Sequence, residues 1–162
     1  MVPDIAPLSR IDSFPYRHRI HEVMRSPVLT APPDLPLLEA ARWMEASRVS
    51  SIIAVAADGT IAGIFTERDL LRLVANAGPA GLEGTLGAVM TRSVVTVPGN
   101  SFVHVALARM ARTGLRHLVV VDAARRPVGI VTGSALLKVR ATEALVLGDS
   151  VETARDGEAM AA

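Results

Sequence analysis

Apolar residues run without interruption at two places in the middle of the chain, over 52–55 and 118–121. Unbroken runs of this length, rich in Ile, Val and Leu, predict strands that are buried on both faces. A second apolar stretch follows each run, at 61–65 and 128–131, and Asp58-Gly59 provides a turn between the first two stretches. The pattern therefore predicts two hydrogen-bonded pairs of strands.

Two other segments place apolar residues at the three- and four-residue spacing of an amphipathic helix, after Asp34 and Asn100, which suit helix N-caps. A further helix is predicted over 66–76, and its apolar positions recur at 136–139. Short β-branched stretches at 27–30 and 94–97 predict an additional strand ahead of each first helix. The predicted unit is strand, helix, strand, strand, helix, present twice. The apolar positions of the first helices are Leu37, Leu38, Ala41 and Met44, and Val103, Ala106, Leu107 and Met110.

The chain repeats itself at an offset of 66 positions, with 14 identities among the 51 pairs that align 23–73 with 89–139. A repeat present only twice is too short for a solenoid, so we expect two units that share one buried face about a pseudo-two-fold axis. The fold class predicted is α/β (α+β). The predicted parts are an arm at 1–19, a repeat at 20–76, a Gly-rich linker at 77–87, a repeat at 88–147 and a flexible tail at 148–162. The groove between the copies is the first place to look for a ligand.

Composition narrows the function classes. The 162 residues include no cysteine, which excludes disulfides and thiolate metal sites and fits a cytoplasmic protein. A net charge of +1 with one Trp and one Tyr gives little attraction for nucleic acid. Pro3 and Pro7 lie where the apolar core of a signal peptide would run, and no apolar run approaches the ~20 residues of a membrane helix. We expect a soluble protein that binds neither nucleic acid nor a membrane, and we expect no metal site.

The segment Gly63-Ile-Phe-Thr-Glu-Arg-Asp69 passes from a predicted strand directly into a helix N-terminus. Thr66 as N-cap and Asp69 three residues later form a variant of the capping box, which needs no ligand. The same residues also suit a ligand, because helix N-terminal amides bind anions, Arg68 is a charged donor, and a carboxylate accepts both hydroxyls of a ribose. Local chemistry favours the cap over the ligand site.

The paired units, the Val-Met opening of each copy and the Gly63 to Asp69 pattern together resemble the tandem cystathionine-β-synthase (CBS) domain pair, over about residues 20–140. The resemblance implies a disc-like module with two clefts that bind AMP, ADP, ATP or S-adenosylmethionine, with Asp69 and Thr66 contacting the ribose or its phosphate. It also implies that a basic residue ahead of a strand contacts the ligand phosphate, here Arg116-His117. The second copy keeps Thr132 but has Ala135 in place of the acid, so we expect its cleft to be empty or altered.

These observations predict a non-catalytic regulatory module that senses an adenosine-containing ligand, with no required cofactor and an unknown regulated protein. The alternative is a structural dimerisation module with a vestigial cleft. An enzyme has little support, because no nucleophile and base or paired-carboxylate cluster stands out. A homodimer is expected, through some of the apolar residues Leu70, Leu71, Leu136 and Leu137 on the outer helices.

Overall fold

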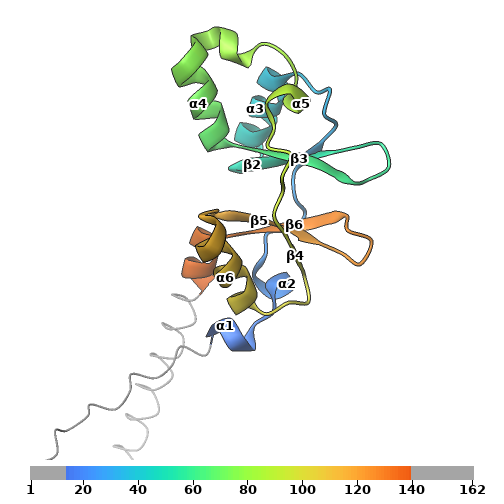
Figure 1. Ribbon diagram of the computed structural model, residues 1–162, viewed down its shortest axis with the longest axis vertical. Coiled ribbons are helices and arrows are strands. Elements are labelled where there is room, and N and C mark those ends of the chain that lie inside the picture. The colour runs from blue at the N-terminus through green and yellow to red at the C-terminus, as the bar shows by residue number, and fades with distance from the viewer. Residues whose placement is uncertain (1–13, 140–162) are drawn as a thin grey trace, which may run out of the picture.

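The computed structural model describes residues 14–139, which fold into two similar halves, one above the other in Figure 1. Each half contains a three-stranded sheet, in the order β1-β2-β3 or β4-β5-β6. The first strand of each sheet is parallel to the second, and the second is antiparallel to the third. The strands are β1 (Thr30–Ala31), β2 (Ser51–Val55), β3 (Ile61–Thr66), β4 (Thr96–Pro98), β5 (His117–Val121) and β6 (Pro127–Thr132).

Two helices accompany each sheet, so the predicted order of strand, helix, strand, strand, helix is confirmed. They are α3 (Leu37–Ala46) and α4 (Glu67–Ala77) in the first repeat, and α6 (Val103–Thr113) and a helix described over 133–139 in the second. None of the helices described within 14–139 is long and apolar enough to cross a membrane. The predicted tail at 148–162 and residues 1–13 of the predicted arm lie outside the described residues.

Asp34 and Asn100 do not cap the first helices, contrary to prediction, because each helix begins three residues further along the chain. The first amide of α3 donates to the Gly84 carbonyl oxygen at 3.0 Å, and the first amide of α6 donates to that of His18 at 2.9 Å. Gly84 and His18 are themselves 66 positions apart. Backbone carbonyls from the segment ahead of the opposite repeat therefore take the place of side-chain caps.

The two repeats exchange their opening helices. The helix α2 (Ile20–Val23) packs in the core that covers β4-β5-β6, together with Phe14 of α1 (Phe14–Arg17). In the same way α5 (Leu86–Val89), which follows the 3₁₀ helix η1 (Gly78–Leu82) in the predicted linker, packs in the core of β1-β2-β3. Each half of the molecule is consequently built from two separate stretches of the chain.

Two glycines make this exchange possible. A Cβ atom on Gly63 would lie 2.5 Å from Met90 Sδ and 3.0 Å from the Thr91 carbonyl oxygen, and Gly129 meets Met24 and the next carbonyl in the same way. These contacts accompany reciprocal backbone hydrogen bonds of 2.8 to 3.0 Å between Ile64 and Thr91 and between Arg25 and Ile130. The repeated Val-Met pair of one repeat therefore packs against the Gly-Ile pair of the other, and this contact occurs twice in the molecule.

A third apolar cluster holds the two sheets against each other. Its fully buried members are Ile53 of β2 and Val119 of β5, which occupy equivalent places in the two repeats. Apolar residues of both extended openings, Val28 and Val94, pack around them. This shared face leaves clefts along its border, where residues of both repeats meet.

Candidate functional site

One of these clefts, named here the Asp69 cleft, has a volume of 560 Å³ and is lined by residues of both repeats. The first repeat contributes the end of β3 and the first turns of α4, and the second contributes the segment ahead of β5 and the end of β6. The structure brings all six predicted site residues to this one cleft: Thr66, Arg68, Asp69, Arg116, His117 and Thr132.

Thr66 and Asp69 form the predicted capping box at the start of α4. Asp69 Oδ2 accepts hydrogen bonds from the Thr66 amide at 3.0 Å and from Thr66 Oγ1 at 2.7 Å, while Thr66 Oγ1 accepts from the Asp69 amide at 3.4 Å. The Asp69 side chain is 22 % exposed, and within residues 14–139 its Oδ1 has only a long contact of 3.9 Å with Arg72. One carboxylate oxygen therefore holds the helix end, and the other is left to accept hydrogen bonds from a ligand.

His117, at the start of β5 in the wall that the second repeat contributes, forms a hydrogen bond to the first repeat. Its Nε2 forms a hydrogen bond of 3.0 Å with Ser50 Oγ. Burial lowers the pKa of His117 below its usual value and the Arg116 charge lowers it further, whereas Glu67 and Asp69 act in the opposite direction. The imidazole is therefore neutral at neutral pH, and the fixed positive charge of this wall belongs to Arg116.

The second cleft, the Ala135 cleft, is the pseudo-symmetric partner of the first and is smaller, at 310 Å³. Each of its lining residues except Glu67 has its counterpart, 66 positions away, in the Asp69 cleft. Thr132 Oγ1 accepts a hydrogen bond from the Ala135 amide at 3.1 Å. The helix at 133–139 therefore keeps the hydroxyl half of the capping box. The Asp69 carboxylate thus has no equivalent in the second cleft.

Sequence reasoning missed Arg25, which narrows the Ala135 cleft. Its guanidinium donates to the carbonyl oxygens of Ser47 at 3.0 Å and Arg48 at 2.9 Å, at the carboxyl end of α3. Thr91 occupies the equivalent place in the Asp69 cleft and is much smaller. Arg72 and Ser50 were also missed, although Arg72 is three residues beyond Asp69 on one helix and Ser50 aligns with Arg116 at the repeat offset.

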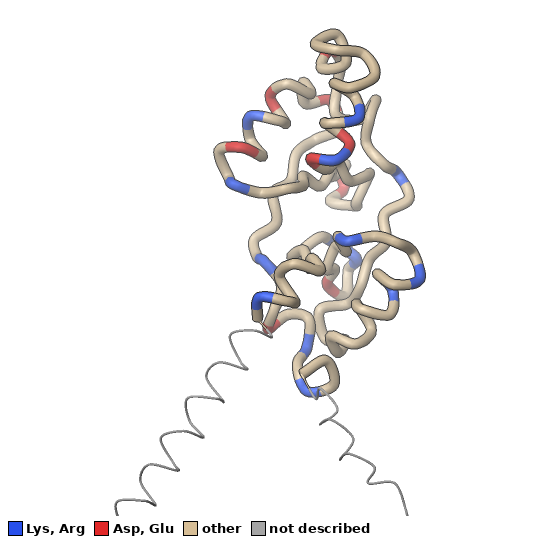
Figure 2. Tube along the Cα trace, turned by 90° about the vertical axis from the view of Figure 1, so that its left-hand side faces the viewer, with Lys and Arg blue, Asp and Glu red and all other residues tan. Residues whose placement is uncertain are grey.

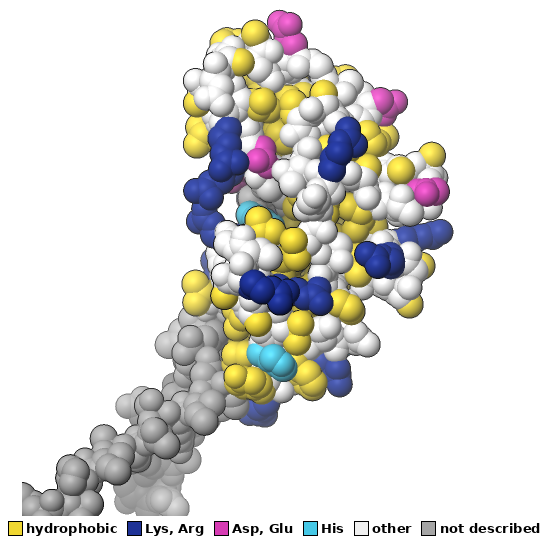
Figure 3. All heavy atoms as spheres, viewed as in Figure 1, with side chains coloured by type: hydrophobic (Ala, Val, Ile, Leu, Met, Phe, Trp, Pro, Cys, Tyr) yellow, Lys and Arg dark blue, Asp and Glu magenta, His cyan; other side chains and the backbone are white. Residues whose placement is uncertain are grey.

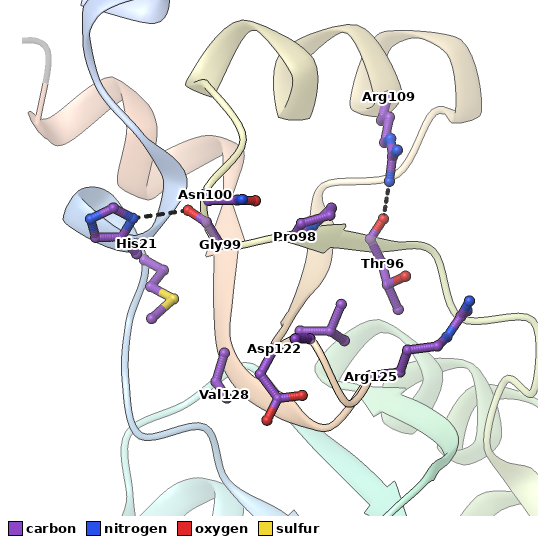
Figure 4. A pocket seen from close by; sticks show the side chains of 12 residues that line it. His21, Thr96, Pro98, Gly99, Asn100, Arg109, Asp122, Arg125 and Val128 are labelled. Atoms are coloured by element: carbon purple, nitrogen blue, oxygen red, sulfur yellow. Dashed lines mark hydrogen bonds between the residues drawn. The ribbon is translucent and has the colours of Figure 1, made fainter.

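Larger hollows lie on the outer side of each repeat, and some of their polar groups already have partners within the same repeat or its neighbouring segment. The hollow beside β4, of 770 Å³, is drawn in Figure 4. There the His21 ring bonds to the Gly99 carbonyl at 3.1 Å, and Arg109 donates to the Thr96 carbonyl. The equivalent hollow of the first repeat, 670 Å³, is mostly apolar around Trp43. The Asp69 cleft is the better candidate, because it lies between the repeats and brings all the predicted site residues together.

A profile of the CBS domain matches the chain twice, over residues 20–76 and 86–142. The chain belongs to the CBS domain family. The resemblance inferred from the sequence is thereby confirmed, as is the predicted fold class of two such repeats. CBS domain pairs are generally regulatory rather than catalytic.

Relatives of this CBS domain pair include proteins with adenosine ligands. It is 32% identical over 120 residues to the uncharacterized protein MK0525 of Methanopyrus kandleri, an alignment that covers 74% of this chain and 61% of that protein. The CBS domain pair of protein MJ0100, in complex with 5′-methylthioadenosine and S-adenosyl-L-methionine, superposes with a TM-score of 0.70, 25% identity and coverage of 78% and 98%. The CBS domain protein PAE2072 of Pyrobaculum aerophilum, complexed with AMP, superposes with a TM-score of 0.67 and 28% identity. The match covers 77% of this chain and 99% of that chain.

Proposed function

We propose that this CBS domain pair is a regulatory module that binds an adenosine-containing ligand in the Asp69 cleft. The observation that carries the proposal is Asp69 Oδ1, which accepts no hydrogen bond from the described residues and lies at the N-terminus of an eleven-residue helix inside a cleft between the repeats. A carboxylate so placed accepts hydrogen bonds from ribose hydroxyls, and the helix end favours an anion nearby. AMP, ADP, ATP and S-adenosylmethionine are the candidate ligands, and the neighbours with AMP or S-adenosylmethionine support this group.

Binding between the repeats suits regulation, because the cleft walls belong to two units that pack through one face. A ligand changes the relative arrangement of the two repeats only if it binds one arrangement better than another. The contact of Ser50 with His117 spans the two walls, so a ligand that fills the cleft acts on both repeats at once. The signal then passes to a regulated protein.

A structural dimerisation module is the second candidate, and the complete capping box favours it. Thr66 and Asp69 already have partners in each other, so their presence is explained by helix stability alone. On this hypothesis the cleft is vestigial and no adenosine compound binds.

Thermal-shift measurements separate the two candidates. A ligand that binds only the folded chain stabilises it by about 2.7 kcal/mol at a hundred times its dissociation constant. For a chain of this size that corresponds to a rise in melting temperature of roughly 5–10 °C. We expect such a rise with at least one of the four adenosine compounds and none with guanosine monophosphate. No rise with any of them would favour the structural module.

We also propose that the chain forms a homodimer through α4 and the helix at 133–139, which lie on the same side of the molecule in Figure 1. Leu71 is 69% exposed and Leu137, its repeat equivalent, is 65% exposed. Leu136, also expected on the rim, is instead buried in the second core, at 4%. Two exposed leucines at matching positions suit an isologous contact with a second copy.

Light scattering at tens of micromolar should give twice the chain mass of 17.1 kDa. Leu71→Lys with Leu137→Lys should give a monomer, because a charge cannot be buried in an apolar contact without large cost. Leu107→Lys, on α6 and 38% exposed, serves as the control and should stay dimeric. A wild-type mass of one chain would refute the dimer.

A further inference from the structure

Arg25 lies on one of the two segments that join the halves of the molecule. These extended openings, 24–29 and 90–95, run between the halves on opposite sides in Figure 2. The backbone of Arg25 is fixed to the second sheet, because its amide donates to the Ile130 carbonyl oxygen at 2.9 Å and its carbonyl accepts from the Ile130 amide at 3.0 Å. Thr91, its repeat equivalent, pairs with Ile64 in the same way. The backbones match, so the clefts differ at this position through the side chains.

The Arg25 side chain crosses to the first half. Its guanidinium donates to the carbonyl oxygens of Ser47 at 3.0 Å and Arg48 at 2.9 Å, which follow the last residue of α3. The final carbonyls of a helix have no partner within it, and a cation is favourable beside them. Where the halves meet in the space-filling view, basic side chains lie close to acidic ones (Figure 3). Arg25 instead donates to backbone oxygens, whose position α3 fixes, so it ties this helix to the second sheet.

The equivalent helix, α6, ends without such a side chain. It is followed by Gly114, with a φ of 67°, whereas the aligned Arg48 has a φ of 51°. Glycine adopts this left-handed conformation without a steric penalty and arginine does not, so the end of α3 depends more on an added contact. The Thr91 side chain makes no such contact among residues 14–139. The cleft beside Thr91 has a volume of 560 Å³, and the cleft beside Arg25 has 310 Å³.

We propose that Arg25 is a built-in occupant of the Ala135 cleft that locks the halves together there and limits the chain to one ligand site. A molecule that enters this cleft has to displace the guanidinium from two carbonyl oxygens, and charge-assisted hydrogen bonds are among the stronger ones in proteins. The cleft thus lacks the acid because of Ala135 and lacks the space because of Arg25. The lock follows from the contacts of Arg25 alone, whereas the limit on site number also rests on the proposed function.

Thiol labelling of the full chain tests the lock without a ligand. Because the chain contains no cysteine, Ala135→Cys provides a single thiol that lines the Ala135 cleft. N-ethylmaleimide, which is uncharged, should react with it about tenfold faster when Arg25→Thr is added, because the lock no longer has to open first. Loss of a nearby positive charge by itself disfavours the reactive thiolate and slows the reaction. A faster reaction therefore reports access to the cleft.

Arg92→Thr is the matched control, because Arg92 also donates to a backbone carbonyl oxygen, that of Gly87 at 2.9 Å, but lines neither cleft. It should leave the labelling rate unchanged. A second thiol probe, Ala106→Cys in the buried core of the second half, reports unfolding and should react equally slowly with and without Arg25→Thr. Equal labelling of Ala135→Cys in the Arg25→Thr and Arg92→Thr chains would overturn the lock.

Calorimetric titration with AMP and, separately, with S-adenosylmethionine tests the number of sites. Ala135→Asp restores the acid, but this variant should still bind one ligand per chain while Arg25 remains. Adding Arg25→Thr should give two sites, and adding Arg92→Thr should not. Two sites in Ala135→Asp alone, or one site when Arg25→Thr is added, would overturn the role of Arg25 in site number. If the wild type binds neither compound, the proposed function falls, and thiol labelling still decides the lock.

Discussion

Replacing Asp69 by alanine should lower the affinity for the adenosine ligand about ten- to 150-fold. The substitution removes charge-assisted hydrogen bonds to the ribose, which contribute on the order of 1.5–3 kcal/mol. The wild-type chain should bind one ligand per chain, because the equivalent residue of the other cleft is Ala135 and Arg25 narrows that cleft. Calorimetric titration of both proteins measures affinity and stoichiometry together.

The control must account for the structural role of Asp69. Asp58→Ala is closely matched, because Asp58 Oδ1 accepts from the Thr60 amide at 2.9 Å and from Thr60 Oγ1 at 2.7 Å, outside both clefts. It removes the same charge and the same kind of local hydrogen bonds. Loss of the cap at Asp69 should itself cost roughly 1 kcal/mol of stability, measured by denaturation. Equal affinities of wild type and Asp69→Ala, or two equivalent sites per chain, would contradict the asymmetric site.

Ile20→Ala should lower the free energy of unfolding by about 2–5 kcal/mol, the range for truncating a fully buried aliphatic side chain. Ile20 is 0% exposed and packs in the core of the second sheet, although the sequence places it at the beginning of the first repeat. Urea denaturation of the wild type and the variant gives the difference. The effect tests whether α2 is buried, which the exchange of opening helices requires.

Leu38→Ala provides the comparison for this measurement, because Leu38 is 45% exposed on α3. A change at such a surface position is expected within about 0.5 kcal/mol. If Ile20→Ala lowers the free energy of unfolding no more than Leu38→Ala does, α2 does not belong to the second core. Leu86, the repeat equivalent of Ile20, is also fully buried and should behave like it.

Local patterns in the sequence were sufficient for the elements and for the candidate site. Unbroken apolar runs predicted β2 and β5, helical spacing predicted α3 and α6, and the offset of 66 showed that both belong to one unit. The Thr66 to Asp69 spacing predicted a capping box, and the structure contains it. These features are set by residues a few positions apart, or by comparing the chain with itself, so no knowledge of tertiary contacts was needed.

Tertiary structure alone decided which half each segment joins. The sequence by itself determined the two repeats, their strands and helices, and the single acid of the paired motifs. It did not determine that α2 and α5 change places, that the carbonyls of His18 and Gly84 replace Asn100 and Asp34 as helix caps, or that Arg25 enters the Ala135 cleft. The physical reason is that a periodic apolar face shows that a segment is buried but carries no information on its partner. Partner choice depends on close packing and hydrogen bonds between residues that are tens of positions apart in the sequence, and these contacts exist only once the chain is folded.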